Sequence, residues 1–334
     1  MKMKKSLLAI SAIACMLGTN AYAQFSLDAK AIQNALQAVQ GSPNAITKAT
    51  GNGEYSNLEK YNVKTPNQCP EHYSLGAPVV VSSEKEKIER RSFYLCNSGY
   101  AAQFDPATKN PIWVAERLTR NDLNAPKEER TDDFKPNPFV PNPAQASLAD
   151  YRGSKLDRGH MAPAADMYGI SPTAMSESFF LTNMVPQVGP NQNRGIWADL
   201  ESKVRAWAKT RGELLVVTGP IYENNVVTMG KSKVWVPTKL YKVIVDPNNF
   251  ESIAFVLPNN QIATSKTRNL DKGNPIYPQT LPENAVKCSP QPCSIENFKT
   301  SIAEVERLTG LRFISLVRDD IRNQVTNGMS GNWR

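Results

Sequence analysis

Histidine is scarce in this sequence: its 334 residues include only two, His72 and His160. This scarcity excludes the zinc hydrolases that depend on several histidine ligands. The sequence also lacks a Gly-x-Ser-x-Gly stretch, the turn that presents the serine nucleophile in α/β-hydrolases. It contains no internal repeat and no low-complexity segment. A zinc site built on several histidines and a serine nucleophile of this type are therefore disfavoured.

Cysteine is scarce too, with five in the chain and no Cys-x-x-Cys pair, which disfavours a zinc site. Four cysteines follow residue 23: Cys69, Cys96, Cys288 and Cys293. An even number in an exported chain predicts two disulfides, for which three connectivities are possible. Cys288 and Cys293 could close a small loop, which would leave Cys69 to pair with Cys96.

No apolar run is long enough to span a bilayer, so the sequence predicts no membrane span. The longest, Leu7 to Leu17, follows a lysine-rich start and precedes the small-residue pattern Ala21-Tyr22-Ala23. This arrangement is typical of a secretory signal peptide cleaved after Ala23. A lipoprotein signal at Cys15 is the less favoured alternative, because Ala12 stands where leucine is usual. We therefore predict an exported protein, periplasmic or secreted.

Acidic residues are outnumbered, giving a net charge of +8 and an isoelectric point near 9.1. This excess favours polyanionic partners and is suggestive of nucleic acid.

Apolar patterning divides the chain into four parts and predicts more strands than helices. Residues 1–23 form the signal peptide, 24–75 an appendage with a short helix at 26–39, 76–323 the main domain, and 324–334 a frayed tail. Two long helices are predicted, at 193–211 and 294–309, ended by Gly212 and Gly310. The region 125–143 holds five prolines and predicts an irregular surface loop. Strands are predicted at 77–81, 91–95, 100–104, 112–115, 177–184, 214–218, 234–245 and 252–257. The pattern favours a mixed α+β domain built on antiparallel sheet.

The stretch Asp157-Arg158-Gly159-His160 is the strongest candidate for a reactive site. Histidine has an ordinary pKa of about 6.5, which suits a general base at neutral pH. On an extended segment Arg158 and His160 project to the same face. A base and a permanent cation aimed at one spot suit attack on a phosphodiester, although four such residues also fit a polar surface turn.

A second candidate lies on the helix predicted at 193–211. Its apolar stripe is Ile196, Leu200 and Val204. A neighbouring stripe at steps of four carries an amide, a ring, a carboxylate and a guanidinium: Asn193, Trp197, Glu201 and Arg205. An exposed Glu–Arg pair of little energetic value is the simpler interpretation of the last two.

Together these segments resemble the DNA/RNA non-specific endonuclease family, which includes the Serratia-type secreted nucleases and mitochondrial endonuclease G. The family's Asp-Arg-Gly-His motif matches residues 157–160 and continues into 161–166. Its next two blocks resemble 181–187 and 193–201, and weaker matches occur at 111–118 and 304–311. The matches run in the family's order over about residues 90–317. The resemblance implies an α+β fold with a ββα-metal core on an antiparallel sheet flanked by helices.

The resemblance also implies a role for each matching residue. His160 would be the general base that deprotonates the attacking water, Asn183 would orient its ring, and Asp157 would shape the motif. Substrate phosphate would be bound by three arginines: Arg117, Arg158 and Arg205.

The metal site implied by the resemblance needs few protein groups. Asn193 would be the one direct ligand of a hydrated Mg²⁺, and Glu201 would hold a metal-bound water. Asn191 is the fallback ligand. Mg²⁺ prefers oxygen ligands and keeps several waters, which fits such a sparse site; Mn²⁺ or another divalent cation is the alternative.

The function implied is therefore an exported Mg²⁺-dependent endonuclease that hydrolyses DNA and RNA without strong sequence preference. From another class, the alternative is an exported nucleic-acid-binding protein on a catalytically inactive nuclease scaffold. A sugar-specific or structure-specific nuclease is a narrower alternative. The sequence leaves open the oligomeric state and the role of residues 24–75.

Overall fold

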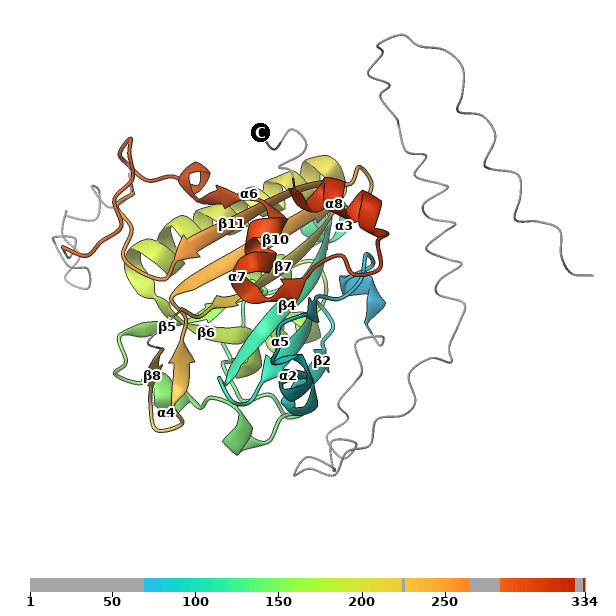
Figure 1. Cartoon of the computed structure of the whole chain (residues 1–334). Coiled ribbons are helices and arrows are strands. Elements are labelled where there is room, and N and C mark those ends of the chain that lie inside the picture. The colour runs from blue at the N-terminus through green and yellow to red at the C-terminus, as the bar shows by residue number, and fades with distance from the viewer. Residues whose placement is uncertain (1–68, 224–225, 265–282, 328–332, 334) are drawn as a thin grey trace, which may run out of the picture. The chain divides into compact units, whose positions relative to one another are not determined.

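The computed structural model describes residues 69–223, 226–264, 283–327 and 333, and within them seven strands form one antiparallel sheet (Figure 1). The strands, in order across the sheet, are β12 (Lys299–Thr300), β11 (Glu251–Pro258), β10 (Lys239–Asp246), β7 (Glu213–Ile221), β4 (Asn110–Thr119), β3 (Ala101–Asp105) and β2 (Phe93–Cys96). Every neighbouring pair is antiparallel, and the long strands β10 and β11 pair over their full length from Lys239↔Pro258 to Asp246↔Glu251.

Three further strand pairs lie outside this sheet. They are β1 (Val79–Val80) with β13 (Leu311–Arg312), β5 (Leu156–His160) with β6 (Met184–Val188), and β8 (Val227–Met229) with β9 (Val234–Val236). The β5–β6 pair carries the Asp-Arg-Gly-His motif.

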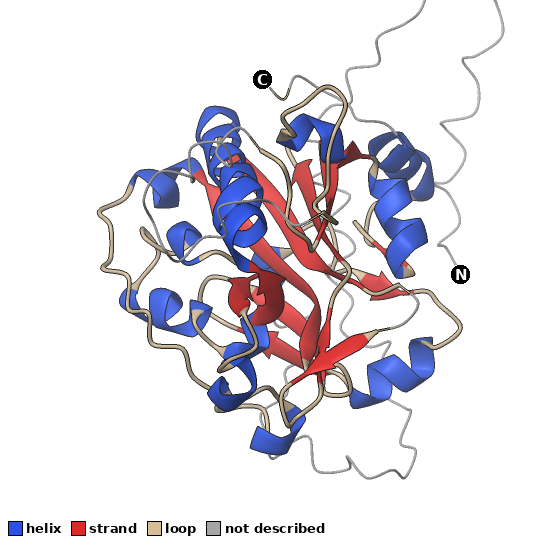
Figure 2. Cartoon of the chain, turned by 90° about the vertical axis from the view of Figure 1, so that its left-hand side faces the viewer, coloured by secondary structure: helices blue, strands red, loops and turns tan. Residues whose placement is uncertain are grey.

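Helices cover both faces of the sheet, as Figure 2 shows from the side. The α-helices are α2 (Lys85–Arg91), α3 (Arg120–Asn124), α4 (Leu148–Tyr151), α5 (Pro172–Ser178), α6 (Ala198–Arg211), α7 (Ile302–Thr309) and α8 (Asp319–Asn327). Short or irregular turns are η3 (Pro70–His72), η4 (Asn142–Ala144), η5 (Ala164–Asp166), η6 (Leu181–Asn183), η7 (Gly189–Trp197) and η9 (Ile295–Phe298). No helix in the described ranges is both long and apolar enough to cross a bilayer.

Strand alternation assigns each sheet residue to one of the two faces. On β10, Ile244 packs in the main core with Val204 and Trp207 of α6. Tyr241 points the other way and meets the Phe313 ring at 5.7 Å. Helix α6 therefore covers one face, with α7 and the C-terminal segment on the other (Figure 1). The predicted α+β class with antiparallel sheet is confirmed.

The long helix predicted at 193–211 is regular only from Ala198 onward. Its apolar stripe, Ile196, Leu200 and Val204, is buried as predicted. The preceding turn is wider than an α-helix, and Gly195 has non-helical angles of φ −117° and ψ −112°. Gly212 ends α6 with a φ of 97°, which glycine adopts without steric cost. The kink separates Asn193 from the regular part of the stripe.

Three other predictions of secondary structure are wrong in part. The segment 177–184, predicted as a strand, contains the end of α5 and then η6, and β6 begins only at Met184. The helix forms because Pro172 suits the first helical turn and the Ser171 side chain caps its N-terminus. Pro237 interrupts the strand predicted at 234–245, because proline cannot donate to the ladder. The helix predicted at 294–309 is interrupted at 299–300 by β12. It starts again as α7, whose N-cap Ser301 accepts from the backbone N–H of Glu304.

The loop at 125–143 is irregular, as predicted, but part of it is buried. Asn137 and Val140 are only 1% and 3% exposed. The Asn137 amide donates to Thr182 Oγ1 at 3.0 Å, and its backbone N–H donates to Gln145 Oε1 at 2.8 Å. The first bond holds the loop against the segment that leads into β6, and the second ties it to the residue after η4.

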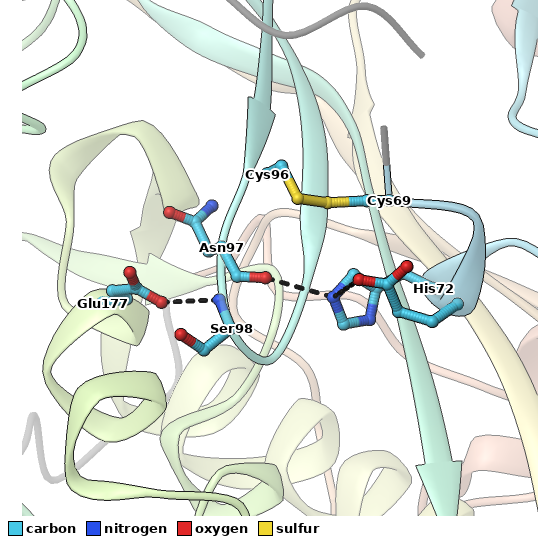
Figure 3. The surroundings of a disulfide bond; sticks show 7 residues. Cys69, His72, Cys96, Asn97, Ser98 and Glu177 are labelled. Atoms are coloured by element: carbon cyan, nitrogen blue, oxygen red, sulfur yellow. Dashed lines mark hydrogen bonds and ion pairs between the residues drawn. A yellow bond between two sulfur atoms is a disulfide. The ribbon is translucent and has the colours of Figure 1, made fainter. Parts of the chain in front are cut away.

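Both disulfides are present, as Cys69–Cys96 and Cys288–Cys293. The first joins η3 to the end of β2, where the buried His72 donates through Nε2 to the Asn97 carbonyl at 3.1 Å (Figure 3). Burial lowers the pKa of His72, so this histidine is a structural donor.

The described structure crosses two of the predicted domain boundaries. The disulfide ties residues 69–75, placed in the appendage, to β2, and α8 continues past residue 324 to Asn327. The predicted signal peptide and the helix at 26–39 lie outside the described residues.

Candidate active site

The antiparallel pair β5–β6, a hairpin whose connection is the long segment 161–183 with η5, α5 and η6, places His160 opposite Met184 and Arg158 opposite Pro186. The side chains of Arg158 and His160 line the same cleft, as their spacing predicts. Glycine is required between them, because a Cβ on Gly159 would lie 1.9 Å from Gln187 Oε1. Gln187 in turn donates to Gln192 Oε1 at 2.6 Å and so ties the hairpin to η7.

Asp157 joins the hairpin to the other half of the site. Its Oδ2 accepts from Asn193 Nδ2 at 2.9 Å and from Arg194 Nε at 3.0 Å. Because the amide nitrogen of Asn193 is used in this way, the amide oxygen remains to act as a ligand. Asn191 instead donates to Gln261 Oε1 at 2.8 Å and does not line the cleft. The geometry favours Asn193 over Asn191 as the metal ligand.

The cleft beside His160 has a volume of about 560 Å³ and is strongly cationic. Its walls carry four arginines against a single carboxylate. The lining residues are Arg130, Phe134, Leu148, Tyr151, Arg152, Leu156, Asp157, Arg158, His160, Asn193 and Arg194. Such a surface attracts a polyanion and presents guanidinium donors suited to phosphate oxygens.

The surroundings of His160 favour its neutral form. Burial, together with the positive charges of Arg130 and Arg158, lowers the pKa of His160 to about 3. Its Nε2 is buried and lacks a hydrogen-bond partner among the described residues. The ring lines the cleft, and a neutral imidazole has one nitrogen that can accept a proton, which is the requirement for a general base.

Asn183 fixes the chain beside His160 and not the ring itself. It is fully buried; its Oδ1 accepts from Ala162 N at 2.9 Å. Its Nδ2 donates to the carbonyls of Ala162 and Ser178 at 2.9 and 2.8 Å. Both amide hydrogens therefore bond to backbone carbonyls, and Asn183 holds the chain at Ala162, two residues after the histidine.

Glu201 and Arg205 belong to a group of charged side chains between α6 and the sheet, together with the buried Glu116, Asp166 and Lys242. Neither Glu201 nor Arg205 is among the residues that line the cleft. Burial raises the pKa of Glu201 to about 7; Lys242 and Arg205 oppose the shift, and Asp166 adds to it. Lys242 is 1% exposed, and its Nζ donates to Thr218 Oγ1 at 2.6 Å.

Arg205 is engaged by a buried carboxylate. Its Nη1 donates to Asp166 Oδ1 at 2.7 Å, and Asp166 is 4% exposed. Its Nη2 donates to Ser202 Oγ at 3.0 Å. This arrangement gives Arg205 a structural task in addition to any contact with phosphate.

Replacement of Arg205 by alanine is expected to destabilise the fold. Removing one partner of a buried ion pair leaves the other without compensation, at a cost of about 3 kcal/mol in the free energy of unfolding. Urea unfolding measures it, with Lys209→Ala as the control because Lys209 is an exposed cation on the same helix. Equal stabilities of Arg205→Ala and wild type would contradict the structural role and leave only phosphate binding.

Arg117 lies away from the cleft. It forms a two-bond pair with Glu213, at 2.8 and 2.9 Å. Its strand neighbour Glu116 is buried on the α6 face, so alternation places Arg117 on the opposite face. The weak match at 111–118 led to the prediction that Arg117 binds substrate phosphate, and the geometry does not support this contact.

Several cleft residues were not found from the sequence. Arg130 and Phe134 come from the proline-rich loop, Arg152 from the end of α4, and Arg194 from η7. The mixed charges of the loop gave no sign of this role. Arg194 could have been identified from the sequence, since it lies between two residues of the block 193–201 that resembles the family.

One other group of side chains could reach a common metal ion within the described ranges: Cys69, Glu71 and His72. Cys69 is bonded to Cys96 and cannot supply a thiolate. This group is therefore not a competing metal site.

Comparisons with known proteins agree with this geometry. The sequence model of a family described as DNA/RNA non-specific endonuclease matches residues 81–320. Nuclease 1, mitochondrial, of Schizosaccharomyces pombe is 35% identical over 247 residues, covering 69% of this chain and 68% of that protein. Endonuclease G, mitochondrial, of Homo sapiens is 30% identical over 238 residues, covering 67% of this chain and 68% of that protein. The crystal structure of an EndoG/EndoGI complex is similar, with a TM-score of 0.53 and 28% identity over 72% of this chain and 95% of that chain.

The prediction of an exported protein, periplasmic or secreted, is contradicted by these relatives. Relatives from fission yeast, budding yeast, frog and human are named as mitochondrial nucleases. A basic N-terminal segment without acidic residues is common to signal peptides and to mitochondrial presequences, so this feature did not separate them. The prediction of a signal peptide and export is withdrawn.

Proposed function

The chain belongs to the DNA/RNA non-specific endonuclease family and is a metal-dependent endonuclease, and we propose from this that its cleft hydrolyses phosphodiester bonds of both DNA and RNA. The observation that carries the proposal is the placement of a neutral His160 among four arginines, beside the amide of Asn193. Phosphate is common to both nucleic acids, and contacts to phosphate carry no base information. Activity without strong sequence preference follows from such contacts.

His160 acts as the general base in this proposal. Water attacks the phosphorus atom as the imidazole takes its proton, and the oxygen of the leaving sugar departs on the opposite side. A base with a pKa near 3 is weak, because efficient proton transfer needs a pKa near the working pH. A phosphodiester bound near Arg130 and Arg158 would offset their charges, which are the smaller causes of the lowering, and so raise the pKa of His160; burial, the largest cause, would remain.

Charge stabilisation falls to the arginines of the cleft. Arg158 lies on the same strand as His160 and is exposed, so it is placed to contact a phosphate oxygen. Arg130 and Arg194 also line the cleft and add to its positive surface. Loss of one such preorganised donor typically costs about 10²- to 10³-fold in rate.

Asn193 is the proposed direct ligand of a divalent cation, Mg²⁺ by preference and Mn²⁺ as the alternative. The residues fit this role, because Asn193 lines the cleft and its amide nitrogen is bonded to Asp157, which leaves the amide oxygen as a possible ligand beside the Asp157 carboxylate. A hard cation bound there supplies charge neutralisation at the phosphoryl oxygens. Glu201 is proposed to act through ordered water, since it is not among the residues that line the cleft.

The test is incubation of the purified protein with supercoiled plasmid and with bulk RNA, in Mg²⁺ or in EDTA. We expect both substrates to be cut in Mg²⁺ and neither in EDTA. A protein that retards both nucleic acids on a gel but cuts neither with any divalent metal is the alternative, a binding protein on an inactive scaffold. Cleavage of only one substrate would instead indicate a sugar-specific nuclease.

A further inference from the structure

The imidazole of His160 lies against two phenylalanine rings from different parts of the chain. Phe134, in the proline-rich loop, meets it edge to face with 5.6 Å between ring centroids. Phe179, directly after α5, meets it at 5.0 Å with the two planes at 89°. The phenylalanine rings are themselves 4.9 Å apart at 89°. All three rings therefore contact one another in the edge-to-face geometry that aromatic pairs prefer.

We propose that Phe134 and Phe179 form an aromatic clamp that positions the His160 imidazole, and that Phe134 is a positioning residue for the reaction. This inference rests on the proposed role of His160 as general base. The ring needs such support, because the buried Nε2 has no partner in the described structure and the amide of Asn183 bonds to backbone.

The clamp also positions two of the cleft arginines. The Arg158 guanidinium lies 4.0 Å from the centroid of the Phe134 ring, and that of Arg130 lies 4.9 Å from the centroid of Phe179. A guanidinium stacked on a ring keeps its charge and its donors while losing conformational freedom. Phe134 thus touches both the proposed base and a proposed phosphate ligand, and coordinates their positions.

The two sides of the clamp are bonded to each other through the backbone. Lys135 N donates to the Phe179 carbonyl at 3.3 Å, and Leu181 N donates to the Lys135 carbonyl at 2.9 Å. Ser176 Oγ donates to Asp133 Oδ2 at 2.8 Å. The residues beside Phe134 are therefore held to those beside Phe179, so the loop is a fixed wall of the site at this point.

The experiment compares Phe134→Leu with a matched change in the same loop, Phe139→Leu. Phe139 is 42% exposed and lies outside the cleft, so its replacement should leave activity unchanged. Phe134 is only half-buried, so leucine there should be tolerated by the fold; thermal melting checks this, and Phe134→Met replaces the variant if it does not fold. Phe134→Tyr keeps the ring and serves as the rescue.

We expect kcat of Phe134→Leu to fall about 10- to 100-fold, since small misplacement of a reacting group has effects of this size. Phe134→Tyr and Phe139→Leu should stay within about 3-fold of wild type, a difference worth less than one kcal/mol. The proton resonances of the His160 ring should shift in Phe134→Leu, while those of His72, the one other histidine, should not.

Two outcomes overturn the clamp: a folded Phe134→Leu with unchanged kcat, or one whose His160 resonances do not move. The resonances separate this inference from the proposed function. If the wild-type protein cuts neither DNA nor RNA, the proposed function fails, and the shift or its absence still decides whether Phe134 positions the ring.

Discussion

Replacing His160 by alanine is expected to reduce cleavage of DNA and of RNA about 10²- to 10⁴-fold, the range for loss of a general base. No other imidazole can take the proton, because His160 is the one histidine among the described residues that line the cleft. The fold should survive, since the β5 backbone is held by its pairing with β6 and by Asn183. Initial rates on a labelled duplex and on a labelled RNA measure the effect.

His72→Gln is the control for this prediction, since His72 is the only other histidine and glutamine keeps a donor for the Asn97 carbonyl. It should cut at the wild-type rate. The base assignment is contradicted if His160→Ala keeps more than about a hundredth of the wild-type rate, because a general base contributes at least about 10²-fold.

The second large effect is expected at Asn193. Asn193→Ala removes the amide oxygen that we propose as the metal ligand, so the rate at saturating Mg²⁺ should fall about 10²- to 10³-fold, as for loss of a preorganised electrostatic contact. The Mg²⁺ concentration needed for half of the maximal rate should rise as well. Asp157 keeps its ion pair with Arg194, so the hairpin and η7 stay joined.

Asn191→Ala is the matched control for Asn193→Ala. Asn191 bonds to Gln261 and lies outside the cleft, so the change should affect stability more than metal dependence. If Asn191→Ala loses the response to Mg²⁺ while Asn193→Ala keeps it, the ligand assignment is reversed.

Local patterns in the sequence predicted the parts of the site that lie close together along the chain. The extended Asp157–His160 stretch placed Arg158 and His160 on one face, and both line the cleft. The apolar spacing of Ile196, Leu200 and Val204 predicted the buried face of α6.

Contacts between distant segments were not predictable in this way. Phe134 and Phe179 meet His160 only because the loop at 125–143 is bonded to the segment after α5, and no periodic pattern encodes that docking. The prediction that Asn193 continues the regular helix of Trp197, Glu201 and Arg205 was wrong for a local reason. Gly195 has non-helical angles and breaks the helix between Asn193 and Trp197. Arg117 was misplaced because a short motif does not say which face of a strand a side chain occupies.

The central claim is that a single cleft cuts both DNA and RNA, and competition between the two substrates tests it most directly. The initial rate on a labelled DNA duplex would be measured in Mg²⁺ with increasing unlabelled RNA, beside the KM for RNA cleavage by the same protein. We predict purely competitive inhibition, with an inhibition constant equal to the KM for RNA. Inhibition that is absent, or that lowers the maximal rate on DNA, would contradict a shared site.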